Sequence, residues 1–274
     1  MPVPRSPSPL RSVIVGRLRA AGCVCAEDEA RLLLAAAQTP TELAAMVDRR
    51  VAGLPLEHVL GWAEFCGLRV AVDAGVFVPR RRTEFLVHQA AVLAIQSGSS
   101  GARARIVVDL CCGSGAVGAA LAASLGRVEL HAVDLDPIAV RCARRNVAAA
   151  GGHVYEGDLY EPLPSAVRGQ VDILVANAPY VPTDSIVLMP PEARDHEPRV
   201  ALDGGPDGVD VHRRVAAGAS PWLAPGGHLL IETSKHQSPL TMDAIAGYGL
   251  IPRVARSEEL DATIVTGTRP ASAR

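Results

Sequence analysis

Residues 171–180 read Val-Asp-Ile-Leu-Val-Ala-Asn-Ala-Pro-Tyr, a mostly apolar, β-branched run that ends in Asn177-Ala178-Pro179-Tyr180. Such a run predicts a strand that is buried in a parallel sheet. Pro179 stops the strand, and it disfavours helical backbone at Ala178. Open α/β sheets bind ligands at the carboxyl ends of their strands, so Asn177 and Tyr180 indicate either a binding site or a simple turn after the strand.

Strands and helices alternate on both sides of this stretch. The alternation predicts an α/β fold with a doubly wound, largely parallel sheet and right-handed crossovers. The last two strands have no helix between them, which predicts an antiparallel addition at the end of the sheet. The predicted strands are residues 106–110, 128–133, 153–155, 171–176, 228–232, 251–255 and 263–266, and the predicted helices are residues 116–125, 138–149, 209–219 and 239–246.

The N-terminal part of the chain follows a different pattern. Apolar residues recur at helical spacing over residues 10–60, which predicts a small bundle of three or four short helices after a Pro- and Ser-rich tail of residues 1–9. Residues 61–72 alternate as in a strand and are interrupted by a glycine, which predicts a β-hairpin. We expect an apolar helix over residues 84–95 and a loop over residues 97–101.

The composition excludes several classes of protein. With 274 residues, of which 49% are hydrophobic and 20% charged, the chain can bury a large core. A net charge of −2 argues against a dedicated nucleic-acid binder, although Arg80-Arg81-Arg82 can form a local basic patch. No apolar run reaches the ~20 residues that a membrane span needs, and the N-terminus lacks the apolar core of a signal peptide, so we expect a cytoplasmic protein.

Cysteines and histidines are not spaced like metal ligands. We therefore expect the six cysteines to be free thiols and no metal to be bound. For His196, His212 and His236 we expect solvated or structural roles. Glu232 ends a predicted strand near the expected site, and its position leaves open whether it lines that site.

A glycine-rich segment, Asp109-Leu110-Cys111-Cys112-Gly113-Ser114-Gly115, lies between the first strand of the sheet and its helix. Glycine allows a tight turn and a close approach of a ligand to the backbone, and a helix N-terminus offers free N–H groups. The spacing Gly113-x-Gly115-x-x-Gly118 also satisfies the dinucleotide fingerprint, so NAD is a competing ligand. Asp134 ends the next strand ~20 residues further on, where an acid binds ribose hydroxyls.

Two acidic residues favour S-adenosylmethionine over NAD. The Asp109 carboxylate can face the cationic amino-acid end of S-adenosylmethionine, whereas it would repel a pyrophosphate. Asp158 follows the third strand, where it can accept a hydrogen bond from an adenine amino group while Leu159 covers the ring. The alternative is a glycine-rich turn with strand-end carboxylates that have only a structural role.

Several further segments, taken together with these residues, match the sequence pattern of a known family. The full set is residues 55–61, 63–65, 77–80, 109–115, 134, 157–158, 177–180 and 197–208. On this set the chain resembles the HemK/PrmC family of S-adenosylmethionine-dependent methyltransferases, which methylate a glutamine side-chain amide in peptide release factors. The resemblance implies a Rossmann-like, seven-stranded class I methyltransferase domain over residues 76–274. It also implies a helical substrate-recognition domain over residues 1–60 and a linking β-hairpin over residues 61–75.

The resemblance also implies roles for single residues. Those implied to bind the cofactor are Asp109, Cys111, Cys112, Gly113, Ser114, Gly115, Asp134, Leu135, Asp158, Leu159 and Asn177. Those implied to bind substrate are Phe77, Pro79, Arg80 and the catalytic motif Asn177-Ala178-Pro179-Tyr180. The implied partner is a protein, a peptide chain release factor with its Gly-Gly-Gln loop. We expect a monomer that does not use nucleic acid as its direct substrate.

The motif suits methyl transfer to an amide for a physical reason. An amide nitrogen is a poor nucleophile because its lone pair is delocalised into the carbonyl. The side-chain oxygen of Asn177 and the backbone carbonyl of Ala178 can each accept one N–H of the target NH₂, which aligns the nitrogen with the methyl group and raises its electron density. Tyr180 can pack against the flat amide. Because the leaving thioether is neutral, no general base is required.

The chain departs from the family at a few positions. Ala178 stands where the family has proline, which affects the rigidity of the motif, and Arg81-Arg82 makes the substrate-side loop more basic. These departures leave two alternatives open. One is a methyltransferase that acts on an exocyclic amine of adenine or guanine in RNA or DNA, which would use the same geometry. The other is a non-catalytic, cofactor-binding scaffold.

Overall fold

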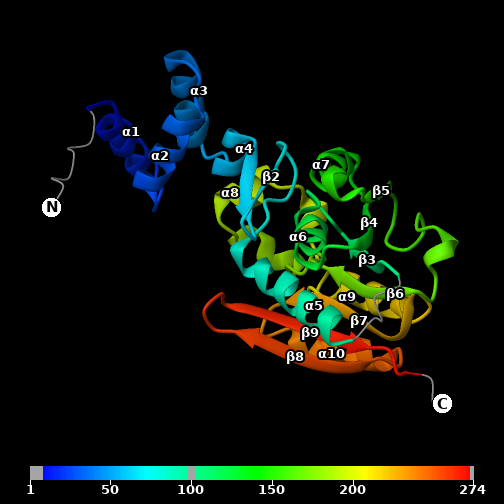
Figure 1. Cartoon of the computed structure of the whole chain (residues 1–274). Coiled ribbons are helices and arrows are strands. Elements are labelled where there is room, and N and C mark those ends of the chain that lie inside the picture. Colours follow the sequence, from blue (N-terminus) through cyan, green and yellow to red (C-terminus); the bar gives the residue numbers. More distant parts are fainter. Residues whose placement is uncertain (1–8, 98–102, 272–274) are drawn as a thin grey trace, which may run out of the picture.

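The computed structural model describes residues 9–97 and 103–271. Figure 1 shows a large α/β unit, with the helices α1 (Pro9–Ala20), α2 (Ala26–Ala36) and α3 (Pro40–Val51) standing apart from it. The predicted tail of residues 1–9 and the predicted loop of residues 97–101 lie almost entirely outside the described residues. None of the described helices is long and apolar enough to cross a membrane.

Seven strands form one sheet in the order β5-β4-β3-β6-β7-β9-β8. They are β3 (Arg105–Leu110), β4 (Val128–Asp134), β5 (His153–Glu156), β6 (Val171–Ala176), β7 (Leu223–Thr233), β8 (Ile251–Ser257) and β9 (Ala262–Thr268). The strands from β5 to β7 in this order run parallel, whereas β9 runs antiparallel to both β7 and β8. The predicted parallel sheet and its antiparallel closing pair are therefore confirmed.

Helices cover both faces of the sheet, which confirms the doubly wound arrangement. They are α5 (Glu84–Gln96), α6 (Ala116–Leu125), α7 (Pro137–Val147), α9 (Asp210–Ala219) and α10 (Ser238–Gly247). Ile173 and Val175 of β6 pack into one core with residues of α5 and α6, while Leu174 and Ala176 pack into a second core with residues of α9 and α10. These four side chains are fully buried, so β6 lies at the centre of the sheet with both faces covered, as its apolar sequence predicts.

The N-terminal helices form a bundle with its own core. The bundle consists of α1, α2, α3 and the short α4 (Leu56–Leu60), as the helical spacing predicts. Thr39 caps α3 by accepting a hydrogen bond from the backbone N–H of Glu42 at 3.1 Å, and a proline follows at the first helical position. At the other end of α3, Arg50 is only 5% exposed and pairs with Glu29 of α2 and with Glu192 of α8 (Pro191–His196). This ion pair joins the bundle to the α/β unit.

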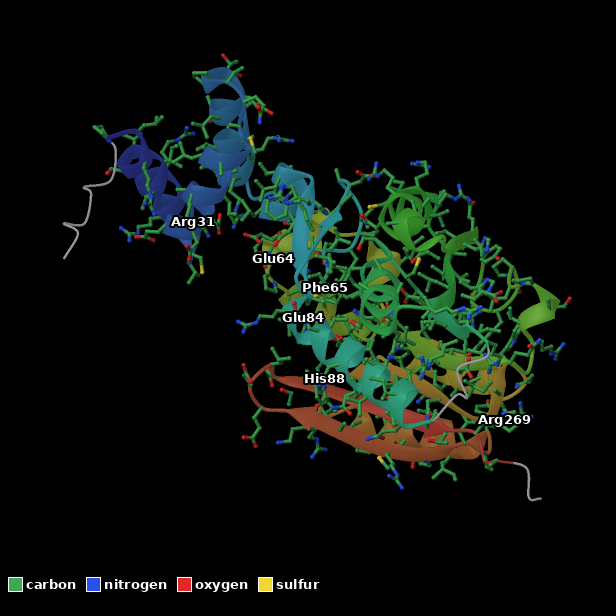
Figure 2. The ribbon with its side chains drawn as sticks, viewed as in Figure 1. Arg31, Glu64, Phe65, Glu84, His88 and Arg269 are labelled. Carbon is green, nitrogen blue, oxygen red and sulfur yellow. The ribbon has the colours of Figure 1, made fainter. Side chains whose placement is uncertain are left out.

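A β-hairpin lies between the bundle and the sheet. It pairs β1 (Trp62–Phe65) with β2 (Leu68–Ala71), as predicted. Cys66 and Gly67 form its two-residue turn with φ values of +49° and +73°, which is the backbone of a type I′ turn. The Glu84 carboxylate at the start of α5 accepts a hydrogen bond from the Cys66 N–H at 2.9 Å, and Phe65 is buried in the core beneath α5. Figure 2 shows Phe65 and Glu84 at this contact.

The segment between β6 and α9 contains helical turns that the sequence reasoning missed. They are η4 (Thr183–Leu188), α8 and η5 (Arg199–Ala201). Short 3₁₀ turns also occur elsewhere, at η1 (Arg81–Thr83), η2 (Ala148–Ala150) and η3 (Ser165–Val167). The missed turns are short and begin after prolines, so they carry no periodic apolar pattern that a sequence could reveal.

Candidate active site

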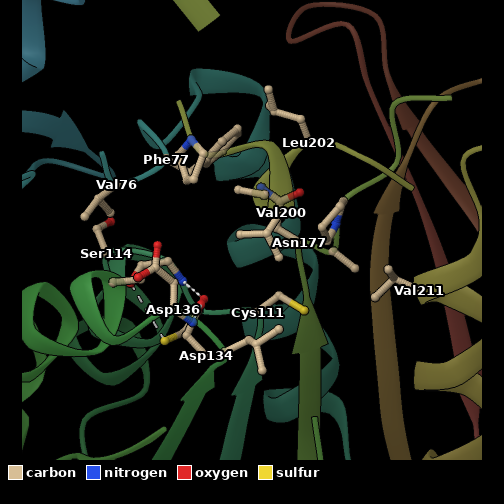
Figure 3. Close-up of a pocket in the computed structure, with 18 of the residues that line it drawn as sticks. Val76, Phe77, Cys111, Ser114, Asp134, Asp136, Asn177, Val200, Leu202 and Val211 are labelled. Carbon is tan, nitrogen blue, oxygen red and sulfur yellow. Dashed lines mark hydrogen bonds between the residues drawn. The ribbon is translucent and has the colours of Figure 1, made fainter. Parts of the chain in front are cut away.

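A cavity of about 560 Å³ opens at the carboxyl ends of β3, β4 and β6. Figure 3 looks into it, with Asp134 and Asp136 on one side, Asn177, Val200 and Leu202 on the other and Cys111 between them. The structure brings nearly all of the residues predicted to bind cofactor or substrate to this cavity. Those that line it are Phe77, Pro79, Arg80, Asp109, Cys111, Cys112, Gly113, Ser114, Asp134, Leu135, Asp158, Leu159, Asn177, Ala178, Pro179 and Tyr180.

Gly115 is the predicted cofactor residue that does not line the cavity. It has a φ of +77°, and a Cβ atom at this position would lie 3.0 Å from the Ala143 Cβ of α7. Gly115 therefore allows the turn into α6 to pack closely against α7, which is a structural rather than a ligand-binding requirement.

The turn between β3 and α6 is fixed by backbone hydrogen bonds. The Cys112 N–H donates to the Val133 carbonyl at 3.0 Å, and the Gly115 N–H donates to the Cys112 carbonyl at 2.7 Å. Cys111 adopts a φ of +55°, a left-handed conformation that is uncommon for a residue with a side chain. Burial raises the pKa of both the Cys111 and the Cys112 thiol, so both remain protonated and poorly nucleophilic.

Asp134 links the first two loops of the site. One of its carboxylate oxygens accepts the Gly113 N–H at 2.7 Å, and the other accepts the Asp136 N–H at 2.9 Å. Asp136 in turn caps α7 by accepting the Ile138 N–H at 2.7 Å. Burial raises the pKa of Asp134, while these two N–H donors lower it. Each oxygen keeps a free lone pair, so the carboxylate can still accept hydrogen bonds from ribose hydroxyls.

Asp109 lies deeper, at the floor of the cavity. Its side chain is 1% exposed, and one oxygen accepts the Gly118 N–H of α6 at 2.8 Å. Burial raises the pKa of Asp109 to about 7, an effect that the Gly118 hydrogen bond opposes. Because the pKa of this buried carboxyl is near neutrality, a cation in the cavity would shift it toward its ionised form.

Asp158 and Leu159 lie on the same side as Asp134. Asp158 forms an ion pair with Arg214 of α9 at 2.5 Å, an interaction that the sequence did not predict. An adenine amino group therefore has to share the Asp158 carboxylate with a guanidinium. Leu159 has a φ of +49° and packs against the core between the sheet and α9.

The motif Asn177-Ala178-Pro179-Tyr180 follows β6 directly. The Asn177 Nδ2 donates to the Thr83 hydroxyl at 3.4 Å, so the Asn177 side-chain oxygen points the other way. The Tyr180 hydroxyl donates to Glu232 at the end of β7 at 3.1 Å, and its backbone carbonyl accepts the Gln237 side-chain amide at 2.8 Å. Burial is the main cause that raises the pKa of Tyr180, so the phenol stays protonated.

The segment of residues 197–208 packs against the motif and is hydrogen-bonded to the residue that follows it. The Val181 N–H donates to the Leu202 carbonyl, and the Gly204 N–H donates to the Val181 carbonyl, both at 2.9 Å. A Cβ atom at Gly204 would lie 2.8 Å from the Pro179 carbonyl oxygen, so only glycine allows this close approach. The same segment places Val200 and Leu202 on the cavity wall, two residues that the sequence reasoning missed.

Phe77, Pro79 and Arg80 form the wall that faces the hairpin. Arg80 lies 4.9 Å from the centre of the Phe77 ring and forms an ion pair with Glu197 at 2.5 Å. Glu197 is 6% exposed and also accepts the Val78 N–H at 3.2 Å. Burial raises the pKa of Glu197, while the Arg80 charge lowers it. The contact ties the loop before α5 to the segment after β6.

The remaining candidates lie outside the cavity lining. His212 of α9 is fully buried, its Nδ1 lies 3.0 Å from the Thr241 hydroxyl, and burial lowers its pKa to about 4. Glu232 is 2% exposed and lies behind Tyr180 rather than on the cavity wall. Among the described residues, no group of three or more histidine, cysteine or acidic side chains is arranged to hold a metal ion. All six cysteines are free thiols, as expected.

Comparison with known proteins agrees with this geometry. The family model of the methyltransferase small domain matches residues 68–189. The chain is 38% identical over 215 residues to the release factor glutamine methyltransferase of Geobacter sulfurreducens, covering 77% of this chain and 72% of the relative. It is 36% identical over 248 residues to that of Mycolicibacterium smegmatis, covering 88% of this chain and 85% of the relative.

A solved structure shares the fold at lower identity. It is the T. thermophilus 16S rRNA N2 methyltransferase in complex with AdoMet and guanosine, with a TM-score of 0.50 and 21% identity. The match covers 76% of this chain and 49% of that chain, and it supports a Rossmann-like methyltransferase fold. The relatives, in contrast, share more than a third of their residues with this chain over most of its length. The chain therefore belongs to the release factor glutamine methyltransferase family.

Proposed function

We propose that this protein transfers the methyl group of S-adenosylmethionine to the side-chain amide nitrogen of a glutamine in a peptide chain release factor. The observation that carries the proposal is the orientation of Asn177. Its amide nitrogen donates to Thr83, which leaves its oxygen as an acceptor at the carboxyl end of β6. An acceptor at this place, beside a cavity with two strand-end carboxylates, matches what an NH₂ group needs in order to be held for alkylation.

The residues around the cavity fit S-adenosylmethionine. The buried Asp109 carboxyl is suited to the cationic amino-acid end, and the Asp134 carboxylate has free lone pairs for the ribose hydroxyls. Leu135 and Leu159 supply apolar surface on the side where the adenine would lie. When bound there, S-adenosylmethionine would supply an electrophilic methyl group, with the neutral thioether S-adenosylhomocysteine as its product.

The chain's own residues would then hold the acceptor amide. The Asn177 oxygen and the Ala178 backbone carbonyl each accept one N–H of the glutamine NH₂. This keeps the nitrogen lone pair in line with the methyl group and lets the nitrogen gain electron density as it attacks. Tyr180, whose hydroxyl is held by Glu232, presents its ring to the flat amide. The nitrogen sheds a proton to solvent as the new C–N bond forms, so the site needs no strong base.

A protein acceptor is favoured over a nucleic acid by the charge at the cavity. Two of the three consecutive arginines in this loop face buried carboxylates, because Arg80 pairs with Glu197 and Arg82 lies 3.8 Å from Glu232. Their charges are therefore partly offset, which leaves less positive potential for a phosphate backbone. We also propose that the bundle of residues 1–60 recognises the release factor, with the hairpin of residues 61–75 as the link to the methyltransferase domain of residues 76–274.

Transfer of a tritiated methyl group tests the proposal. The acceptors are a bacterial release factor, its Gln→Ala variant in the Gly-Gly-Gln loop, and RNA and DNA. We expect label on the intact release factor and none on the variant. Label on the variant, or on nucleic acid alone, would show that the acceptor is wrong. Cofactor binding without any transfer would instead support a non-catalytic scaffold.

A further inference from the structure

A small polar network joins the motif to a buried carboxyl behind it, and all of its members except Glu232 line the cavity. It contains Asn177, Thr83, Glu232, Tyr180 and Arg82. Thr83 and Glu232 are 1% and 2% exposed, and they come from the turn before α5 and from the end of β7. Two of the contacts are direct: Asn177 Nδ2 donates to Thr83 at 3.4 Å, and the Tyr180 hydroxyl donates to Glu232 at 3.1 Å.

The direction of these hydrogen bonds is set by what each group can donate. An asparagine amide can turn over and exchange its oxygen for its nitrogen, so its neighbours decide which end faces the cavity. A buried hydroxyl has one proton, and the Thr83 proton must find an acceptor. The Glu232 carboxyl lies beside it, and its buried Oε2 has no other partner that would compete for this proton. Burial raises the pKa of Glu232, while hydrogen bonds from Thr83 and Tyr180 and the charge of Arg82 at 3.8 Å lower it. In the ionised form that these contacts favour, the carboxylate can only accept.

We propose that Glu232 and Thr83 are positioning residues that fix the Asn177 side chain with its oxygen toward the acceptor amide. Glu232 takes the Thr83 proton, which leaves the Thr83 oxygen free to accept from Asn177 Nδ2. The same carboxylate takes the Tyr180 proton and so holds the ring of Tyr180. The inference rests on the proposed function, because it assigns a purpose to the orientation that this function requires.

The network also explains what its loss would do. Without an acceptor for its proton, the Thr83 hydroxyl can turn and donate toward Asn177. Asn177 then turns its amide over and presents NH₂ to the NH₂ of the incoming glutamine. Two donors cannot form a hydrogen bond, so the acceptor nitrogen is no longer aligned with the methyl group. We expect S-adenosylmethionine binding to be independent of this orientation, since the hydrogen bonds of Asp109 and Asp134 run to Gly118, Gly113 and Asp136 and not to the network.

Matched variants test the network by activity. Thr83→Val keeps the shape of the side chain and removes its hydroxyl, and Glu232→Gln replaces an acceptor by a group that can also donate. We expect each to lower kcat for release factor methylation by ~10-fold or more, with the cofactor Kd unchanged. Thr83→Ser should recover most of the lost kcat because it keeps the hydroxyl. Thr266→Val, which removes a buried hydroxyl on β9 away from the cavity, serves as the control for destabilisation alone.

Two further measurements separate positioning from a general loss of structure. Because Thr83 and Glu232 act through the same amide, the double variant should lose little more kcat than either single variant. Additive losses, or a Thr83→Val variant with the kcat of the native protein, would overturn the inference. The side-chain amide resonances of ¹⁵N-labelled asparagine provide a readout that needs no acceptor protein. A shift of the Asn177 signal in both variants supports the network, and an unchanged signal refutes it, even if the release factor proves to be the wrong acceptor.

Discussion

Asp109 offers the sharpest test of how the cofactor is held, because its ionisation changes within an accessible pH range. Its carboxyl is 1% exposed, and burial raises its pKa from the ordinary value of 3.8 to about 7. A cationic ligand that faces Asp109 binds to the ionised form. Binding should therefore tighten as the pH rises through this pKa, and it should release a proton in the lower part of the range.

The size of the effect follows from the raised pKa. A carboxyl with a pKa of about 7 is ionised in roughly 3% of molecules at about pH 5.5 and in roughly 75% at about pH 7.5, so the Kd should fall ~25-fold between them. Asp109→Asn removes this ionisation and can still accept the Gly118 N–H. Its Kd should change little over the same range and should be weaker than that of the native protein at the higher pH.

Isothermal titration with S-adenosylhomocysteine measures both the Kd and the number of protons released on binding. Titration in two buffers with different ionisation enthalpies gives the number of protons released, and the Asn variant separates Asp109 from Asp134, whose pKa is also raised by burial. A native Kd that does not vary with pH, with no proton released, would refute the reasoning. It would place the cationic end of the ligand away from Asp109.

Three other substitutions test the site and the fold. Asn177→Ala should lower kcat by ~10²-fold or more, because it removes an acceptor that acts in the transition state, and near-normal turnover would show that the site is misplaced. Arg50→Ala leaves the buried Glu29 without its partner and should cost ~3–5 kcal/mol in urea unfolding, and adding Glu29→Ala should restore part of it. Gly218→Ala places a methyl group against the partly buried ring of Tyr160 and should cost ~1–3 kcal/mol, which an unchanged Tm would contradict.

The sheet could be predicted because each strand is indicated by the residues of its own short segment. The strand of residues 171–176 is a continuous apolar run, and its burial on both faces follows from that run alone. The glycine-rich turn and Asp134 follow from the rule that ligands gather at the carboxyl ends of parallel strands. Nearly all of the residues that the sequence indicated for cofactor or substrate binding therefore line the cavity.

The contacts that orient these residues were not predictable, because they join distant parts of the chain. Thr83 and Asn177 are 94 positions apart, and Asp158 and Arg214 are 56 positions apart. Nothing in the local pattern of either residue indicates its partner. The turns that bring Val200 to the cavity are likewise stabilised by tertiary packing and by hydrogen bonds to the strand-end motif rather than by propensity. The domain boundaries at residues 60 and 75 stay predictions.

The buried arginine at the end of α3 has a consequence for how sequences of this kind can diverge. Arg50 contacts carboxylates on two separate elements, Glu29 within the bundle and Glu192 in α8. A lineage that loses the arginine must also neutralise Glu29, and it then loses the charge that attracts Glu192. The three positions should therefore change together among homologues, with an apolar residue at 50 accompanied by uncharged residues at 29 and 192. Homologues with such joint changes would need a contact other than this ion pair to hold the bundle against the catalytic unit.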